Sequence, residues 1–220
     1  NEIYLDQSGG SGTFTIKQDG STNKFGAVND RAGLTGNSKT FTSITTGTGN
    51  NILIQETGNS TTTELLITGN TNEVDSNVEG DSNDTTFEIT GNTNTLLVKA
   101  DVAADVENTT NNSNIDVTIE GNTNDVTFSM VDTDAAVNLW TLIGDLNVVN
   151  SYQQGQTGGI GHAQTVELFG SSNNVDIYQI GTEAHTIDLE VLGSDNDYTI
   201  TQTDGTTSTY TNPAAVTTQP

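Results

Sequence analysis

The chain has 220 residues, with 29 Asp and Glu against 5 Lys and Arg, so its formal net charge is −24. It contains no cysteine, which excludes a disulfide framework, a thiolate metal site and a cysteine nucleophile. No apolar run approaches the ~18 residues of a membrane-spanning helix, and nucleic-acid binding needs the Lys and Arg that this chain lacks, so we expect neither membrane insertion nor a nucleic-acid partner.

Apolar and polar residues alternate in short segments along most of the chain, although hydrophobic residues make up only 31% of it. A period of two predicts strands with one buried face. The inward residues are mostly β-branched or aromatic, as strands prefer. In chain order the segments are 1–7, 14–18, 52–54, 65–67, 85–89, 96–98, 115–119, 126–130, 175–179, 187–191 and 198–202.

Glycines recur between these segments at intervals of eleven residues, and asparagine follows many of them three residues later. Because glycine adopts positive φ freely and asparagine tolerates the left-handed region, each Gly-x-x-Asn unit predicts a corner. The predicted structural corners are Gly20 and Asn23, Gly47 and Asn50, Gly69 and Asn72, Gly80 and Asn83, Gly91 and Asn94, Gly121 and Asn124, Gly144 and Asn147, Gly170 and Asn173, and Gly193 and Asn196.

One strand and one corner fill eleven residues, and such a unit cannot bury its apolar face alone. Two units make a coil, and stacked coils form two facing parallel sheets. The predicted fold is therefore all-β, a parallel two-sheet β-solenoid of about nine 22-residue coils, on the order of 40 Å long at ~4.8 Å per coil. A meander of β-hairpins is the competing interpretation, but the Asn-Gly turns typical of hairpins are absent.

The solenoid is predicted over residues 1–205, with irregular spacing at 24–46, 99–112 and 155–163. These three ranges are either loops that carry function or drift in an old repeat. Residues 206–220 are rich in threonine, which predicts an extended tail.

The pattern Asn1-x-Ile3-x-Leu5-x-Gln7 is followed by Phe14-x-Ile16-x-Gln18, and related spacing returns at 147–155 and 173–181. This pattern resembles the curlin repeat. Curlin repeats form the subunits of curli, secreted bacterial fibres with a cross-β solenoid core, and similar repeats occur in structural proteins of marine bacteriophages. The resemblance implies a solenoid fold and an extracellular structural role rather than an activity. The glutamine of the repeat is replaced elsewhere by Glu56, Ile67, Val78, Ile89, Ile119 and Val191.

Inward asparagine and glutamine residues can stack on their copies one coil away, where each amide donates and accepts a hydrogen bond along the rod. We expect an inward amide ladder that includes Gln7, Gln18, Gln153, Gln179 and Gln202.

The charge is unevenly distributed along the chain. Residues 1–40 contain four acidic and four basic residues, whereas residues 41–220 hold 25 acidic residues and only Lys99. An end without net charge docks more easily against another surface, including an acidic one. We therefore expect an attachment end at the N-terminus, with chance clustering of basic residues as the alternative. Its basic residues are Lys17, Lys24, Arg31 and Lys39.

Residues that support catalysis are few, and no enzymatic activity is expected. The two histidines, His162 and His185, lie in separate units, so a Ser-His-Asp triad has little support. Outward acids such as Asp116 and Glu120 can find partners in the neighbouring coil, ~4.8 Å away, for the carboxylate pair that glycoside hydrolysis uses, but an acid-rich surface also produces such pairs by chance.

Three further segments could bind a ligand. Acidic corners at 81–84 and 195–197 offer oxygen ligands for calcium, although solvated turns are the simpler interpretation and no cofactor is expected. Trp140, the single tryptophan, lies in the most apolar segment, which is either a wide core layer or an exposed binding patch.

The sequence thus predicts a non-enzymatic structural protein, a curlin-like β-solenoid displayed on a virion surface or in an extracellular appendage. Its expected partners are further copies of the chain or other structural proteins of the virion or appendage. Two alternatives stay open: a curli-type functional-amyloid fibre subunit of an extracellular matrix, and a receptor- or carbohydrate-binding fibre module that recognises a cell-surface glycan.

Overall fold

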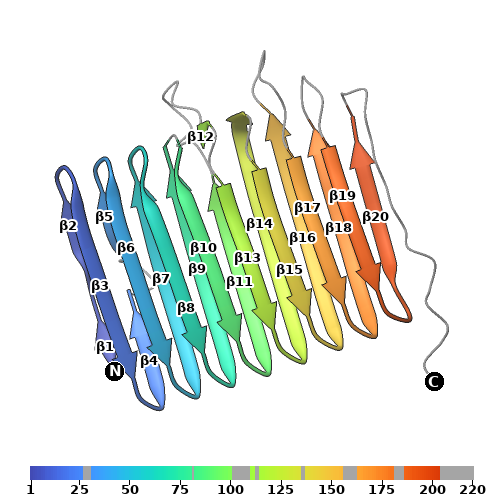
Figure 1. Cartoon of the computed structure of the whole chain (residues 1–220), viewed down its shortest axis with the longest axis horizontal. Coiled ribbons are helices and arrows are strands. Elements are labelled where there is room, and N and C mark those ends of the chain that lie inside the picture. Colours follow the sequence, from blue (N-terminus) through green and yellow to red (C-terminus); the bar gives the residue numbers. More distant parts are fainter. Residues whose placement is uncertain are drawn as a thin grey trace.

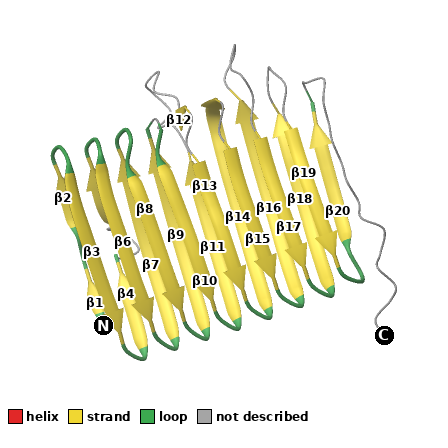
Figure 2. Cartoon of the chain, viewed as in Figure 1, coloured by secondary structure: helices red, strands yellow, loops and turns green. Residues whose placement is uncertain are grey.

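The structure is a computed structural model that describes residues 1–26, 31–80, 82–100, 110–111, 114–134, 137–155, 163–180 and 186–203. Every regular element in these residues is a β-strand, and Figure 2 shows strands along the whole length of the molecule. Within the same residues no helix has the length and apolar character needed to cross a membrane.

The strands form two sheets, and within each sheet all paired strands run parallel. Sheet A contains β1 (Glu2–Ile3), β2 (Asp6–Ser8), β4 (Thr22–Phe25), β5 (Ala32–Thr35), β7 (Gly49–Thr57), β9 (Thr71–Glu79), β11 (Thr93–Ala100), β12 (Thr110–Asn111), β14 (Thr123–Asp134), β16 (Leu146–Gly155), β18 (Ser172–Ile180) and β20 (Asp197–Gln202). Sheet B contains β3 (Gly12–Asp19), β6 (Lys39–Thr46), β8 (Thr62–Thr68), β10 (Asp84–Thr90), β13 (Asn114–Glu120), β15 (Val137–Ile143), β17 (Ala163–Phe169) and β19 (Thr186–Leu192).

The chain alternates between the two sheets, so the fold is a parallel β-solenoid, as predicted, and not a meander of hairpins (Figure 1). The eight strands of sheet B mark about seven complete turns, fewer than the nine coils expected. The difference arises because the turns are not uniform. Equivalent residues of successive coils are 22 residues apart in the shortest turns and 30 in the longest.

A thin apolar core fills the space between the sheets, because the inward residues of both sheets are the apolar ones of the alternating pattern. Trp140 on β15 is fully buried, packs edge-on against Phe128 at 4.7 Å between ring centroids, and donates its indole N–H to the Ile115 carbonyl at 3.2 Å. Its neighbours Val137 and Leu139 point outward and are 55% and 46% exposed. The segment is therefore core on one face and exposed apolar surface on the other.

Two kinds of corner join the sheets. Corners from sheet B to sheet A lie along the lower edge in Figure 1, and all of them carry Gly-x-x-Asn. A Cβ atom on Gly91 would lie 2.1 Å from the carbonyl oxygen of Gly69 in the coil beside it. Glycine is needed at these corners because the coils approach closely. The expected positive φ is wrong for the six middle corners, from Gly47 to Gly170.

Corners from sheet A to sheet B lie along the upper edge in Figure 1. In the first coils they do use the left-handed region. Ser38, Ser60 and Ser82 occupy equivalent positions in three successive corners, with φ of 57°, 58° and 56°. Each follows a glycine of positive φ by two residues.

The three irregular ranges have different structural outcomes. In 24–46, sheet A is split between β4 and β5, and the regular strand β6 follows. Most of 99–112 and of 155–163 lies outside the described residues, between the end of a sheet A strand and the start of a sheet B strand. The tail 206–220 also lies outside the described residues.

Candidate functional site: the asparagine ladder and the ends of the solenoid

A single line of asparagines runs through the interior along the whole stack. The side-chain amide nitrogen of each member donates to the amide oxygen of the member in the next coil, through eight hydrogen bonds of 2.7 to 3.1 Å. The members, in order, are Asn1, Asn23, Asn50, Asn72, Asn94, Asn124, Asn147, Asn173 and Asn196. All donors point the same way, so the ladder has a direction.

The second hydrogen of each amide holds the corner in place. Asn94 Nδ2, for example, also lies 3.2 Å from the carbonyl oxygens of Gly91 and Glu120. Asn94 is fully buried, yet its donor and acceptor are both used. A buried amide with all its partners stabilises the structure, and aligned amides polarise one another.

From the sequence we predicted that these asparagines lie at corners, and we explained their presence there by their tolerance of the left-handed region. That explanation is wrong, because none of them has positive φ. Each lies within or just before the first two residues of a strand of sheet A, and the seven members from Asn23 to Asn173 are buried. The eleven-residue spacing located the residues, but their role is to join coils.

Gly80 and Asn83 form the one predicted pair that belongs to the other kind of corner, from β9 to β10. Asn83 does not join the ladder. Its side-chain oxygen accepts hydrogen bonds from the Thr61 backbone N–H at 3.0 Å and from the Thr61 hydroxyl at 2.8 Å.

The five predicted glutamines separate into two groups. Gln179 Nε2 donates to Gln153 Oε1 at 2.8 Å, and Gln202 Nε2 donates to Gln179 Oε1 at 2.9 Å, which makes a second, shorter ladder in the last coils. Gln18 instead lies on sheet B and donates to the Lys24 carbonyl, and Gln7 donates to the Ser8 carbonyl.

The four basic residues of the expected attachment end do not form one surface. Lys17 and Lys24 are exposed on β3 and β4. Lys39 is 1% exposed, and its Nζ donates to the Gln7 carbonyl at 3.0 Å, inside the solenoid. Arg31 forms an ion pair with Asp75 on β9 and donates to the Asp75 carbonyl. The Lys39 ammonium group is therefore not accessible to a docking partner, and the Arg31 side chain is already paired with Asp75.

The two ends of the solenoid differ from its middle. Apolar residues of the terminal coils pack against the core but are only partly buried, because no coil covers their other side within the described residues. These residues are Ile3, Leu5, Phe14, Ile16 and Ile200. The asparagine ladder also reaches both ends, with Asn1 as its first donor and Asn196 as its last acceptor.

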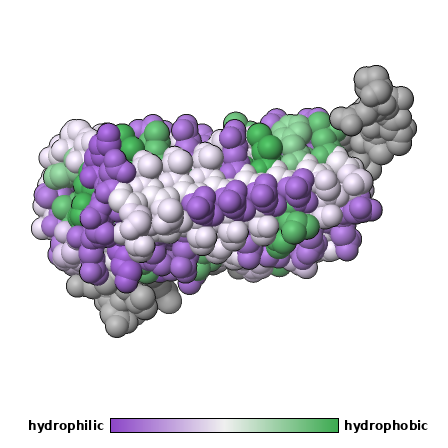
Figure 3. Space-filling model, turned by 90° about the horizontal axis from the view of Figure 1, so that it is seen from below, coloured by the Kyte–Doolittle hydropathy of each residue, from purple (hydrophilic) through white to green (hydrophobic). Residues whose placement is uncertain are grey.

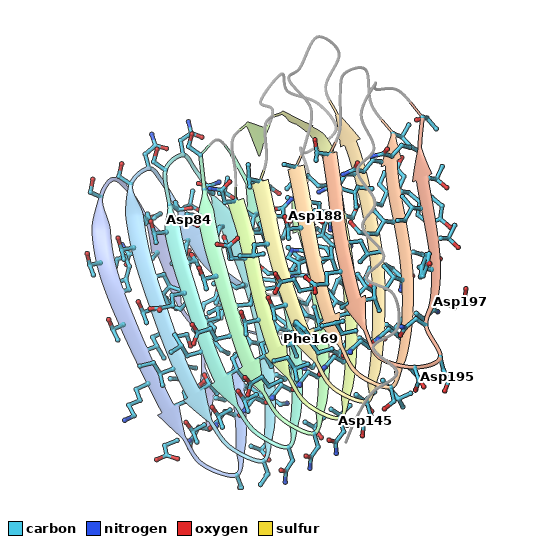
Figure 4. The ribbon with its side chains drawn as sticks, turned by 45° about the vertical axis from the view of Figure 1, so that its right-hand side comes forward. Asp84, Asp145, Phe169, Asp188, Asp195 and Asp197 are labelled. Carbon is cyan, nitrogen blue, oxygen red and sulfur yellow. The ribbon has the colours of Figure 1, made fainter. Side chains whose placement is uncertain are left out.

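Most acidic residues lie on the outer faces, with Glu56 as a buried exception, and Figure 4 labels Asp84, Asp188 and Asp197 among the outer ones. In the registered pairs of the described strands, Glu167 and Glu190 are the acids directly opposite one another. Most others alternate with uncharged residues along the stack, which reduces repulsion between like charges.

Neither Asp116 nor Glu120 has an acidic residue in register beside it within the described strands. Asp116 lies beside Thr86 and accepts a hydrogen bond from the Leu139 backbone N–H, and Glu120 lies between Thr90 and Ile143. Partial burial, and the nearby Asp84 to a lesser degree, raise the pKa of Asp116.

No group of three acidic or histidine side chains in the described part of the chain is arranged to hold a metal ion. Asp81, one of the acids of the first proposed calcium corner, lies outside that part, as do both histidines, His162 and His185.

Sequence reasoning missed one apolar feature of the outer surface. Ile143, Phe169 and Leu192 are aligned in register across β15, β17 and β19 on the outer face of sheet B. Figure 3, which looks onto the lower edge, shows apolar patches toward both ends of the rod and hydrophilic residues between them. Alternation predicted that these positions face outward, but did not indicate that three of them are neighbours.

Comparison with protein-family models, with curated proteins and with solved structures found no match. The resemblance to the curlin repeat therefore stays a prediction that depends on the spacing of the residues.

Proposed function

We propose that this chain is a non-enzymatic structural protein, a rigid β-solenoid displayed on a virion surface or in an extracellular appendage and attached through its N-terminal end. The observation that carries the proposal is the unbroken asparagine ladder. The ladder uses one residue of each coil to join that coil to the next, and none of its residues forms a cleft.

The N-terminal end suits attachment for two reasons. The outer edges of β1 and β3 pair with no other described strand, and exposed strand edges are ready templates for further strands. Ile3 and Phe14 beside these edges are only partly buried, so a partner that covers them gains apolar contact.

Charge favours the same end. Residues 1–40 have no net charge, whereas the remainder carries −24. The structure weakens this argument, since only Lys17 and Lys24 of the four basic residues are exposed, and Lys24 lies beside Glu2. Neutrality of the end, rather than a basic patch, therefore supports docking against an acidic surface.

Fractionation of the native source tests display. An antibody against the rod should recover the chain with virions or with extracellular appendages. Recovery only from the soluble contents of the cell would contradict the proposal.

A second candidate function, a fibre subunit that stacks end to end, is favoured by one observation. The inward residues of the last sheet A strand are Asn196, Tyr198, Ile200 and Gln202, and those of the first are Asn1, Ile3, Leu5 and Gln7. Both sets follow the order amide, apolar, apolar, amide, in the same direction. A second copy placed beyond β20 would bring its Asn1 next to Asn196 and continue the ladder.

Electron microscopy of the purified chain separates the two candidates. The rod of the first proposal stays about 40 Å long at every protein concentration, in low salt and in 0.5 M NaCl, where its charge is screened. Filaments of unlimited length would replace the first proposal with the second. In that case Ile3→Lys, which points a charge into the edge, should abolish the filaments, and Thr95→Lys on the outer face should not.

A further inference from the structure

Among the residues whose burial is described, one acidic side chain lies in the interior, at a position where the curlin-like pattern would have glutamine. Glu56 on β7 is fully buried, and its neighbours in register are Leu34 on β5 and Val78 on β9. Both neighbours are apolar, so neither can stabilise a charge. The polar groups near Glu56 come from the facing sheet.

Those groups form a short chain of hydrogen bonds. The Thr61 hydroxyl lies 3.2 Å from Glu56 Oε2 and 2.8 Å from Asn83 Oδ1. The Asn83 oxygen also accepts the Thr61 backbone N–H, so it can only be an acceptor. A threonine hydroxyl has a single hydrogen, and the shorter contact indicates that it goes to Asn83. With that hydrogen on Asn83, the contact with Glu56 is a hydrogen bond only when the carboxyl group is protonated and donates to Thr61. When the carboxyl group is ionised, the hydroxyl can donate to Glu56 or to Asn83, but not to both.

The Thr63 hydroxyl on β8 and the Thr61 hydroxyl favour the ionised form of Glu56, but burial disfavours it more strongly. Glu56 Oε1 is buried without a hydrogen-bond partner of normal geometry, as is the hydroxyl of Thr85 on β10. Lys39 on β6 is the other ionisable side chain that is buried among the described residues. Its Nζ is bonded to the Gln7 carbonyl and lies over the ring of Phe14, at 5.8 Å from its centroid.

We propose that Glu56 is a proton-operated latch, which in its neutral form ties β7 to the corner that enters β10 through Thr61 and Asn83, and which loosens the N-terminal coils when it ionises. Loss of the proton leaves the single Thr61 hydrogen to serve either Glu56 or Asn83, so one of the two hydrogen bonds is lost. It also leaves a charge among Leu34, Val78 and two hydroxyl groups, without a cation. An unpaired buried charge is costly, so the coils around it should open more readily.

Burial raises the pKa of Glu56 from its ordinary value of 4.5 to about 7, against a smaller lowering by the Thr63 and Thr61 hydroxyls. The folded chain thus binds more protons than the unfolded chain between these two values. Stability therefore falls as the pH rises through this window and is constant above it. A shift of this size changes the unfolding equilibrium by about 300-fold across the window.

Urea unfolding between pH 4 and pH 9 tests the latch, with the full chain in 0.5 M NaCl. Glu56→Gln keeps the shape and can donate to Thr61 at every pH. Glu64→Gln, on the exposed face of the neighbouring strand β8, removes the same charge and is the control. We expect the first unfolding transition of the wild type and of Glu64→Gln to weaken as the pH rises from 5 to 8. In Glu56→Gln that weakening should be smaller by about 100-fold, because only the part of the window between pH 5 and pH 7 is crossed.

Parallel pH profiles for the wild type and Glu56→Gln would overturn the proposal. A second measurement does not depend on the folding of any variant. In a ¹³C titration of the glutamate side-chain carboxyl signals of the wild type, one signal should titrate near pH 7. If every glutamate carboxyl titrates near its ordinary value, the latch is excluded.

Discussion

Replacing Asn94 with alanine removes a central member of the asparagine ladder, and we expect it to lower the free energy of unfolding by about 3 kcal/mol. The substitution deletes the hydrogen bonds to Asn72 at 2.8 Å and to Asn124 at 2.9 Å. Asn72 Nδ2 keeps the carbonyl of Thr90, so the main orphan is the amide oxygen of Asn124, which is buried. One buried unpaired acceptor costs about 1–3 kcal/mol, and each lost hydrogen bond about 1 kcal/mol more.

The assay is urea unfolding followed by circular dichroism, together with hydrogen exchange at the Gly91 and Gly121 amides of the adjoining corners. The exchange measurement is needed because stacked repeats can open locally. Asn92→Ala is the matched control, since Asn92 is exposed at the same corner. The reasoning is refuted if Asn94→Ala destabilises the chain no more than Asn92→Ala does, or leaves exchange at both corners unchanged.

Three further substitutions, one of them with its own control substitution, test the packing of the coils and the ion pair between them. Gly91→Ala should separate adjacent coils, because its Cβ would lie 2.1 Å from a backbone carbonyl, whereas Gly49→Ala meets nothing within 4 Å and should leave the thermal midpoint nearly unchanged. Trp140→Ala should cost about 3–5 kcal/mol in urea unfolding, and the blue-shifted fluorescence of the buried indole should be lost. Arg31→Ala should cost about 1 kcal/mol at low salt and less at high salt, because the pair with Asp75 is a quarter exposed and therefore screened; a salt-independent loss would argue against the ion pair.

The sequence predicted the strands, their inward residues and the parallel stacking well, for a physical reason. The core is thin, and every coil places the apolar residues of its alternating pattern inward. Alternation in segments such as 115–119 and 126–130 is therefore enough to identify the buried face. The number of turns was overestimated, because the longer turns include residues that no period reveals, such as those between β11 and β13.

The role of the polar interior was harder to predict. The spacing located Asn94 but could not show whether its side chain serves the corner or points inward, because Asn94 both ends the corner and lies at the start of β11. Lys39 was assigned to the attachment end because four of the five basic residues lie within residues 1–40. Its burial follows from the register, which places it at an inward position of β6 where the Gln7 carbonyl can accept a hydrogen bond from its ammonium group.

Cysteine cross-linking tests the central claim, the parallel in-register stacking of coils, most directly, and the absence of native cysteine makes it clean. Thr71 and Thr93 are partners in register on β9 and β11, and adjacent parallel strands lie ~4.8 Å apart, within reach of a disulfide. We expect Thr71→Cys with Thr93→Cys to form an intramolecular disulfide under mild oxidation. Leu66→Cys with Glu73→Cys, which a β8–β9 hairpin would pair but which lie here on different sheets, should not form one. The opposite result would contradict the solenoid and the ladder within it.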